Sequence, residues 1–264
     1  MRKIYAAVMA FAMLFCLIPT MKVNASGEAL REIDTKHEYV QSASEPVISI
    51  DQFKEFQNEG IIGEDVSYET FLFAVNESNE AYEMLDRSDR FHQIYNYSVQ
   101  SLSAGQLKAG DILITNAVNS LGIIGHAAIV IGYDLIMDIP GPGNTIRTMS
   151  SENFKSCFQK GWIKIYRPVF WDEGNAAAVW ARNNYLNKKP VYKITMNINS
   201  TTETYCSKIV FQAYKFGVGR KAFNEYPQFN GSTVDMVCDY DNNFMIIAPY
   251  HLPISLCVNN VGEL

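Results

Sequence analysis

The chain has 264 residues, of which 48% are hydrophobic and 19% charged, with a formal net charge of −6. This apolar content is enough to bury a full core. An acidic chain without a lysine or arginine run lacks the basic face that nucleic acids require, and it offers no basic amphipathic stretch for anionic lipid. We therefore expect no nucleic-acid partner.

The first 25 residues have the pattern of a secretory signal peptide. Arg2 and Lys3 form a basic start, an apolar run follows from Ile4 to Ile18, and Val23-Asn24-Ala25 supplies small residues for cleavage. Cleavage there would also remove Lys22, so the loss of three basic residues and no acidic one would change the net charge from −6 to −9. We expect a secreted or cell-wall-associated protein without an integral membrane span; a retained N-terminal anchor is the alternative.

A polar stretch follows, and two helical patterns come after it. The first, around Ile50–Phe56, is short and ends at Gly60, whereas the second begins near Ser67, a plausible N-cap residue. We expect this region to be packing cover for the rest of the chain. The expected segments are a signal peptide (1–25), a linker (26–46), a helical appendage (47–100) and a catalytic domain (101–264).

Strand patterns begin at Gly110-Asp111, where Asp111 is expected to support the turn. The later part of the chain alternates strands with two helices, which predicts an α+β fold. The expected strands cover 112–115, 126–131, 135–139, 161–167 and 191–198, and the expected helices cover 175–186 and the run from Cys206.

Four cysteines remain after the signal peptide, at positions 157, 206, 238 and 257. Their density is low and their spacing fits neither a disulfide scaffold nor a zinc site. One disulfide among Cys157, Cys238 and Cys257 would leave Cys206 free, as a cysteine enzyme requires. None of the four histidines has a partner at metal-ligand spacing, so we expect no metal and no cofactor.

Cys206 and His126 are the candidate catalytic pair. Cys206 starts an apolar helical run, and a helix N-terminus lowers the pKa of a thiol. His126 starts a strand, where its imidazole can hold the thiolate and later deliver a proton. The alternatives are a small core cysteine and a structural histidine, and His251 in the C-terminal loop is the reserve base.

Asp138 is the candidate third member, because a hairpin turn near residues 132–133 would put it on the same sheet face as His126. A shift of one residue in register would separate the two side chains. A carboxylate in an apolar strand needs a partner, and Asp138 could fix the imidazole tautomer. The alternative is a carboxylate that supports the turn through backbone N–H groups.

These motifs resemble the circularly permuted branch of the NlpC-type papain-like cysteine hydrolases, and the YiiX/YycO-like group within it. The matching motifs are Gly-Asp-Ile-Leu at 110–113, Gly-His-Ala-Ala-Ile-Val-Ile at 125–131, the run 205–214 and the tail 246–252. The resemblance covers about residues 101–255. It implies an antiparallel sheet or partial barrel packed on the cysteine-bearing helix, with Cys206 as nucleophile, His126 as base, Asp138 as third member and Tyr205 in the substrate pocket.

Together with export, the resemblance implies a secreted cysteine peptidase or amidase that cleaves amide bonds through a thioester. Its expected substrate is a peptide or peptidoglycan fragment of the cell wall. The alternatives are an acyl thioesterase or lipid acyltransferase, and a peptide-binding or amino-acid-binding module without turnover. An acyl-chain enzyme should have an apolar groove near Tyr205, whereas an amidase should have polar groups that hold an amine or a carboxylate.

Overall fold

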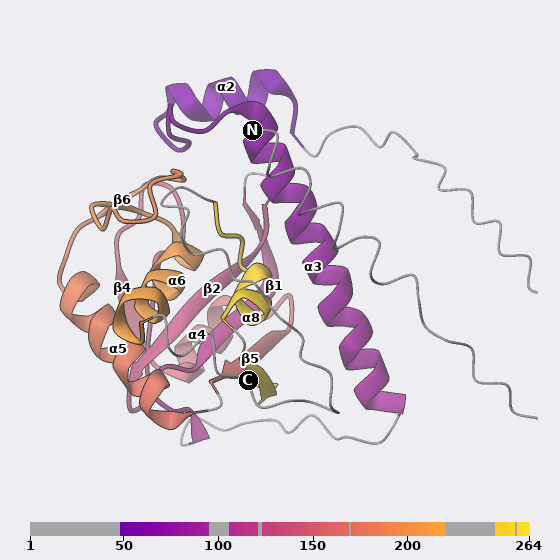
Figure 1. Cartoon of the computed structure of the whole chain (residues 1–264), viewed down its shortest axis with the longest axis vertical. Helices are drawn as coiled ribbons and strands as arrows, with labels where there is room; N and C mark the ends of the chain where they lie inside the picture. The colour runs from indigo at the N-terminus through magenta and orange to yellow at the C-terminus, as the bar shows by residue number, and fades with distance from the viewer. Residues whose placement is uncertain (1–47, 95–105, 121–122, 169, 220–245, 257) are drawn as a thin grey trace, which may run out of the picture. The chain divides into compact units, whose positions relative to one another are not determined.

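The computed structural model describes residues 48–94, 106–120, 123–168, 170–219, 246–256 and 258–264, all of them in a unit that spans Glu45–Leu264 (Figure 1). The predicted signal peptide (1–25), the predicted linker (26–46), Cys238 and Cys257 lie outside the described residues. The described residues form an α+β structure around one antiparallel sheet, as the sequence predicts.

This sheet has six strands in the order β4-β3-β2-β1-β5-β8, and β4 and β8 are its edges. Neighbouring strands are antiparallel throughout. In the central pair, Thr115 lies opposite His126 and Ile112 lies opposite Ile129. The strands are β1 (Ile112–Ser120), β2 (Ile123–Gly132), β3 (Leu135–Asp138), β4 (Arg147–Met149), β5 (Ile163–Arg167) and β8 (Asn259–Glu263).

The two faces of the sheet belong to two separate apolar clusters, because successive strand residues point to opposite sides. One face, with Ile112 and Ile129, packs against α5 (Trp171–Tyr185) and α6 (Cys206–Gly217). The other face, with Leu113 and Val130, packs against Phe154 and Phe158 in and just after α4 (Ser151–Cys157). Burial on both faces explains why the residues of β2 from Gly125 to Ile131 are almost all apolar.

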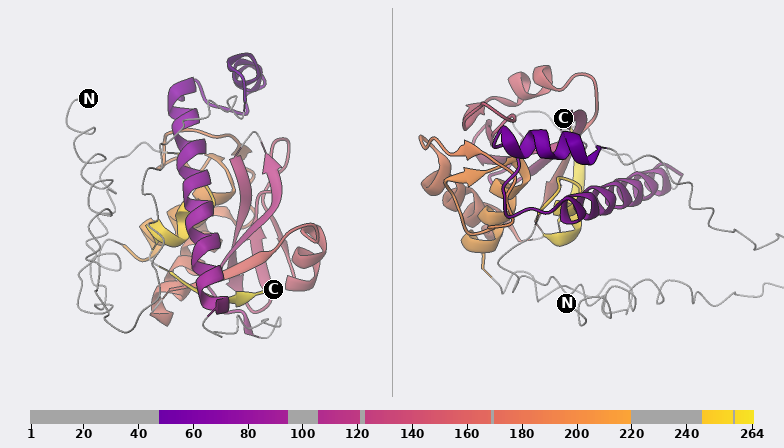
Figure 2. Two further views of the ribbon diagram at one scale, coloured as in Figure 1. Left: turned by 90° about the vertical axis from the view of Figure 1, so that its right-hand side faces the viewer. Right: turned by 90° about the horizontal axis from the view of Figure 1, so that it is seen from above.

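Two helices precede the sheet, as predicted: α2 (Ile50–Asn58) and α3 (Tyr68–Ile94). Ser49 and Gln52 form a capping box at the start of α2. The Ser67 hydroxyl accepts the N–H of Thr70 at 3.1 Å at the start of α3. Figures 1 and 2 show α3 running along the sheet, where it contacts β2 and α8 (His251–Ser255).

The structure corrects two predicted elements. Helix α5 begins at Trp171 rather than near Asn175, and its N-cap residue Phe170 makes no side-chain capping bond. The strand predicted over 191–198 is shorter. Only β6 (Val191–Tyr192) pairs with β7 (Glu203–Thr204), and Ile194 adds a single bridge to Ile62. Within the described residues, no helix is both long and apolar enough to cross a bilayer.

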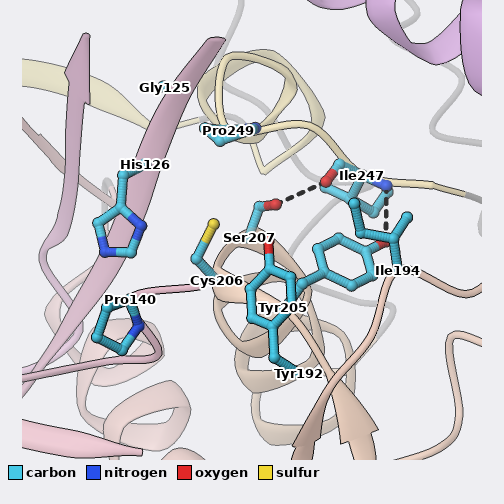
Figure 3. A pocket seen from close by; sticks show the side chains of 10 residues that line it. All are labelled: Gly125, His126, Pro140, Tyr192, Ile194, Tyr205, Cys206, Ser207, Ile247 and Pro249. Carbon is cyan, nitrogen blue, oxygen red and sulfur yellow. Dashed lines mark hydrogen bonds between the residues drawn. The ribbon is translucent and has the colours of Figure 1, made fainter. Parts of the chain in front are cut away.

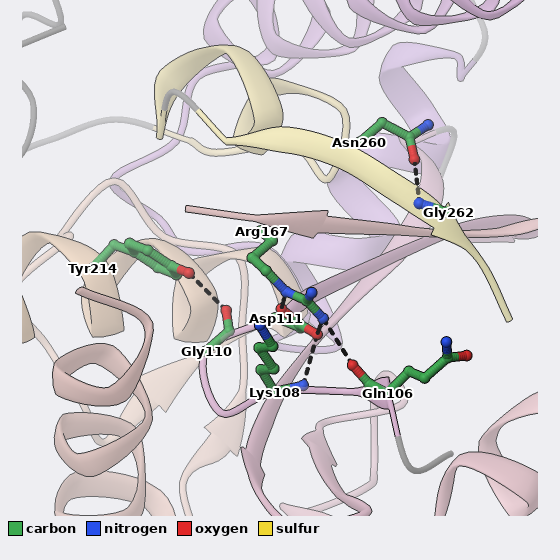
Figure 4. Close-up of polar contacts among 8 residues, drawn as sticks. All are labelled: Gln106, Lys108, Gly110, Asp111, Arg167, Tyr214, Asn260 and Gly262. Atoms are coloured by element: carbon green, nitrogen blue, oxygen red, sulfur yellow. Dashed lines mark hydrogen bonds and ion pairs between the residues drawn. The ribbon is translucent and has the colours of Figure 1, made fainter. Parts of the chain in front are cut away.

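The turn at the start of β1 is tied to two other elements (Figure 4). Asp111 is fully buried, and its carboxylate accepts Nε and Nη2 of Arg167, both at 2.6 Å. The same carboxylate accepts the N–H of Lys108 at 2.8 Å. The carbonyl oxygen of Gly110 accepts the hydroxyl of Tyr214 in α6 at 2.6 Å. The turn therefore connects β1 to β5 and to the helix that carries Cys206.

Candidate active site

Cys206 is the first residue of α6 and is only 8% exposed. The N-cap residue, Tyr205, makes no side-chain capping bond, so the first N–H groups of the helix are left for other acceptors. The sulfur accepts hydrogen bonds from the backbone N–H groups of Ala127 in β2 and Ser207 in α6. Burial opposes ionisation of this thiol, but the charge of His126 and these hydrogen bonds outweigh it, so the pKa of Cys206 is lowered.

His126 and Asp138 meet across the hairpin of β2 and β3. Val130 lies opposite Ile136 and Ile129 lies opposite Met137, so Asp138 falls diagonally across from His126 on the same face. The Nε2 atom of His126 is 2.7 Å from Oδ2 of Asp138, and both side chains are buried. The other ring nitrogen, Nδ1, is left for Cys206, with which the imidazole shares a hydrogen bond. Figure 3 shows the sulfur pointing toward the ring.

Burial by itself would lower the pKa of His126, since it disfavours the imidazolium. The negative charge of Cys206 and the hydrogen bond to Asp138 outweigh burial and raise this pKa to about 9. The rings of Phe158 and Phe154 lie 5.1 and 6.4 Å from the imidazole and restrict its movement. With the lowered pKa of Cys206, these shifts favour a thiolate–imidazolium pair at neutral pH.

Arg147 extends this line of side chains beyond Asp138. It lies directly opposite Asp138 in the pairing of β3 and β4. Its Nε is 2.7 Å from Oδ1 and its Nη2 is 2.9 Å from Oδ2 of that carboxylate. Burial would raise the pKa of Asp138, but hydrogen bonds from His126 and Arg147 lower it. The carboxylate is therefore ionised and held between two donors.

We expect Arg147→Gln to slow the reaction of the site by about tenfold, because the carboxylate that orients His126 loses its bidentate partner. The measurement is the rate at which Cys206 is alkylated by iodoacetamide at a fixed reagent concentration. Arg182, an exposed arginine in α5, supplies the matched control, and Arg182→Gln should behave as the wild type. An unchanged rate in Arg147→Gln would show that Phe154, Phe158 and the hairpin orient His126 without it.

A narrow pocket opens beside the sulfur of Cys206 (Figure 3). The lining contains no Asp, Glu, Lys or Arg, and its ionic groups are the Cys206 thiolate and the His126 imidazolium. The lining residues are Gly125, His126, Pro140, Tyr192, Ile194, Tyr205, Cys206, Ser207, Ile247 and Pro249.

Tyr205 lies in this lining, where the sequence predicts it. Its hydroxyl, however, accepts the N–H of Ile247 at 3.0 Å, and the neighbouring Ser207 hydroxyl donates to the carbonyl of Ile247 at 2.6 Å. Both contacts fasten the segment before α8 to the start of α6. The ring of Tyr205 is thus available to a substrate, while its hydroxyl already has a partner.

The structure places His251, the reserve base, away from the pocket. The Nδ1 atom of His251, the first residue of α8, accepts the N–H of Ala248 at 3.4 Å, and His251 is not among the lining residues. Burial lowers the pKa of this histidine. Cys157 and Cys206 are both free cysteines, the first exposed and the second buried. Cys157 therefore takes no part in the disulfide that the sequence leaves possible among Cys157, Cys238 and Cys257.

Sequence reasoning missed Arg147 and the apolar lining residues. A signal for Tyr192 and Ile194 was present, because alternation over 191–198 puts both on one face. For Arg147 the signal is weak: a Pro-Gly-Pro-Gly turn follows Asp138, and only the length of that turn decides which residue returns opposite the carboxylate.

Residues 81–252, more than half of the chain, match the family model of LnsA-like lipoprotein N-acylation proteins. The chain belongs to this family. All four residues of the candidate site, Cys206, His126, Asp138 and Arg147, lie within the matched residues. The narrower assignment to the permuted NlpC-type hydrolases stays a prediction.

Two further proteins are similar to this LnsA-like chain. An uncharacterized 30.3 kDa protein of Bacillus thuringiensis is 39% identical over 125 residues, which cover 44% of this chain and 46% of that protein. The chain therefore matches about half the length of this curated relative. The crystal structure of the metalloprotein YiiX from Escherichia coli O157:H7 has a TM-score of 0.40 and 13% identity, over 60% of this chain and 98% of that chain.

Proposed function

We propose that this protein is a cysteine acyltransferase that carries a fatty-acyl group on Cys206 as a thioester. The observation that carries the proposal is the pocket beside the sulfur, whose walls are formed by side chains such as Tyr192, Ile194 and Ile247. An apolar lining suits an acyl chain, whereas the amine or carboxylate of a peptide needs charged or polar partners. Membership of the lipoprotein N-acylation family supports the same chemistry.

In the first half of the reaction, the Cys206 thiolate attacks the carbonyl carbon of the acyl donor. The N–H groups in the first turn of α6 are suited to the oxyanion that forms. The bond to the leaving group then breaks, and His126 gives its proton to that group. The products are an acyl thioester on Cys206 and a neutral imidazole held by Asp138.

In the second half, a neutral amine attacks the thioester carbonyl. His126 takes the proton of the amine, the carbon–sulfur bond breaks, and the thiolate–imidazolium pair is restored. The family description suggests the N-terminal amine of a lipoprotein as the acceptor. If residues 1–25 direct export, as we expect, the protein would meet such acceptors outside the cytoplasm.

The second candidate is hydrolysis of an amide bond in a cell-wall peptide, because the line of Cys206, His126 and Asp138 serves an amidase equally well. The two reactions share the thioester and differ in what reacts with it. The order of the His-bearing strand before the Cys-bearing helix also supports our proposal of a circularly permuted papain-like fold. A binding module without turnover would not need a lowered thiol pKa.

Trapping the thioester tests the proposal. We expect the wild-type protein, incubated with a diacyl phospholipid, to gain the mass of one acyl group, which neutral hydroxylamine removes. Cys206→Ala should gain nothing, and Cys157→Ala, which removes the other described cysteine, should gain the acyl group as the wild type does. Acyl transfer to a lipopeptide amine would support the acyltransferase, whereas cleavage of peptidoglycan fragments without phospholipid acylation would favour the amidase.

A further inference from the structure

Ile194 forms part of the pocket wall, and only one loop supports its backbone among the described residues. It is 2% exposed and lines the pocket with Tyr192. Regular strand pairing ends at Tyr192, so residue 194 is outside both sheets and has only its single bridge to Ile62. The N–H of the preceding Lys193 still donates to the carbonyl of Thr204 at 2.8 Å, whereas both backbone groups of Ile194 itself are held by the α2–α3 loop, residues 61–65.

The loop binds both backbone groups of Ile194. The N–H of Ile194 donates to the carbonyl of Ile61 at 2.9 Å, and the N–H of Gly63 donates to the carbonyl of Ile194 at 2.8 Å. Two residues further on, the N–H of Met196 donates to Oδ2 of Asp65 at 2.9 Å. These three hydrogen bonds fix the wall segment along its length, because each immobilises a different peptide group.

The loop itself has little freedom. The side chain of Gln57 in α2 donates from Nε2 to the carbonyls of Gly63 and Val66, at 3.1 and 3.0 Å. Gly63 has no room for a side chain, since a Cβ there would collide with the Asp65 carboxylate and lie 3.3 Å from the carbonyl oxygen of Ile194. A change at Gly63 or Asp65 would thus be transmitted directly to the wall.

We propose that Ile194 limits the size of the acyl group that Cys206 accepts, and that the loop of residues 61–65 holds Ile194 in place for this purpose. The inference rests on the proposed function. It gives the N-terminal helices a part in substrate selection: α2 and the loop after it set one wall of a pocket whose catalytic groups lie on β2 and α6.

The test separates pocket size from enzyme activity by alkylating Cys206 with N-hexyl and N-hexadecyl iodoacetamide. The readout is the ratio of the two labelling rates, measured by mass spectrometry on the peptide that carries Cys206, because Cys157 is also a free cysteine. We expect Ile194→Ala to raise the hexadecyl-to-hexyl ratio by about tenfold, since one or two methylenes in an apolar pocket discriminate to that extent. Ile194→Val, a milder change in a buried position, should shift the ratio in the same direction by a smaller factor.

Asp65→Ala and Gly63→Ala test the loop without touching the pocket lining. Both should raise the ratio, because both release the N–H of Met196 from its acceptor. Glu64→Ala, at an exposed position of the same loop, should leave the ratio unchanged. A ratio that stays at the wild-type value in both Ile194 variants would overturn the inference, and a ratio altered only by those variants would remove the loop from it.

The same variants with phospholipid donors of different chain length connect the pocket to the reaction. We expect Ile194→Ala to favour longer acyl groups on Cys206. If the wild-type protein formed no acyl thioester with any donor, the proposed function would fail. The alkylation ratio would still decide whether Ile194 limits access to the sulfur, so the two failures are distinguishable.

Discussion

His126→Ala should slow alkylation of Cys206 by about 100-fold near pH 6.5, because a thiol with the ordinary pKa of about 8.5 is only about 1% ionised there. In the wild-type protein the imidazolium lowers the pKa of this thiol against the opposing effect of burial. Without it, burial is opposed only by the N–H groups of Ala127 and Ser207. The thiolate would then form only as the pH approaches or exceeds that of a free cysteine.

His126→Ala should slow acyl transfer by more than it slows alkylation, since His126 also moves the proton in both halves of the proposed reaction. A general acid–base contributes about 10² to 10⁴ in rate. In the wild type, acylation should rise with pH through the lowered pKa of Cys206 and fall as His126 loses its proton near its pKa of about 9. In His126→Ala the falling limb should be missing, because no imidazolium remains to titrate.

The measurement is the pH profile of alkylation by iodoacetamide, mapped to Cys206 by mass spectrometry, beside the profile of acylation. His251→Ala is the matched control, because this second histidine lies outside the pocket lining and should leave both profiles unchanged. Equal labelling of the wild type and His126→Ala at acid pH would show that another group stabilises the thiolate.

The sequence supports the prediction of this site where the residues act over short distances. The proximity of His126 and Asp138 follows from one hairpin, since a turn at residues 133–134 fixes which side chains share a face. The place of Cys206 at a helix start follows from the apolar run after it. Both features need only local geometry, which alternation and helical periodicity describe.

The residues that sequence reasoning missed depend on contacts between distant segments. Ile194 belongs to the pocket because the loop around Gly63 binds its backbone, some 130 positions earlier in the chain. Lys208 and Gln212 in α6 are fully buried, although their residue types are mostly found at surfaces. The Lys208 amine donates to the carbonyl of Glu203 at 2.7 Å, an acceptor that no helical pattern predicts.

Neither the export of the protein nor its substrate follows from the hairpin and helix patterns that predict Cys206, His126 and Asp138. The apolar run of Ile4–Ile18 leads us to propose a secreted protein, and the test is the N-terminal sequence of the protein recovered from its host. The change from an expected peptidoglycan amidase to a proposed acyltransferase rests on the lining of the pocket. Only its three-dimensional assembly shows that Pro140, Ile194 and Pro249 surround one sulfur.

Asp111→Ala should lower the free energy of unfolding by about 3–5 kcal/mol, the usual cost of removing one partner from a buried ion pair. The substitution would leave the Arg167 guanidinium, only 21% exposed, without its carboxylate and the N–H of Lys108 without its acceptor. The measurement is urea unfolding followed by circular dichroism. Asp51→Ala, at an exposed position of α2, is the control and should change the stability by less than about 1 kcal/mol.

The same variant separates support of the fold from chemistry. The Gly110 carbonyl beside Asp111 anchors Tyr214 of α6, so loosening this turn weakens the attachment of the helix that carries Cys206. Well below its unfolding midpoint, Asp111→Ala should nevertheless keep the wild-type pH profile of Cys206 alkylation, because no charge near the sulfur changes. A pH profile shifted toward that of His126→Ala would instead mean that the Gly110–Asp111 turn fixes the distance between α6 and β2. The turn would then help to position Cys206 against His126.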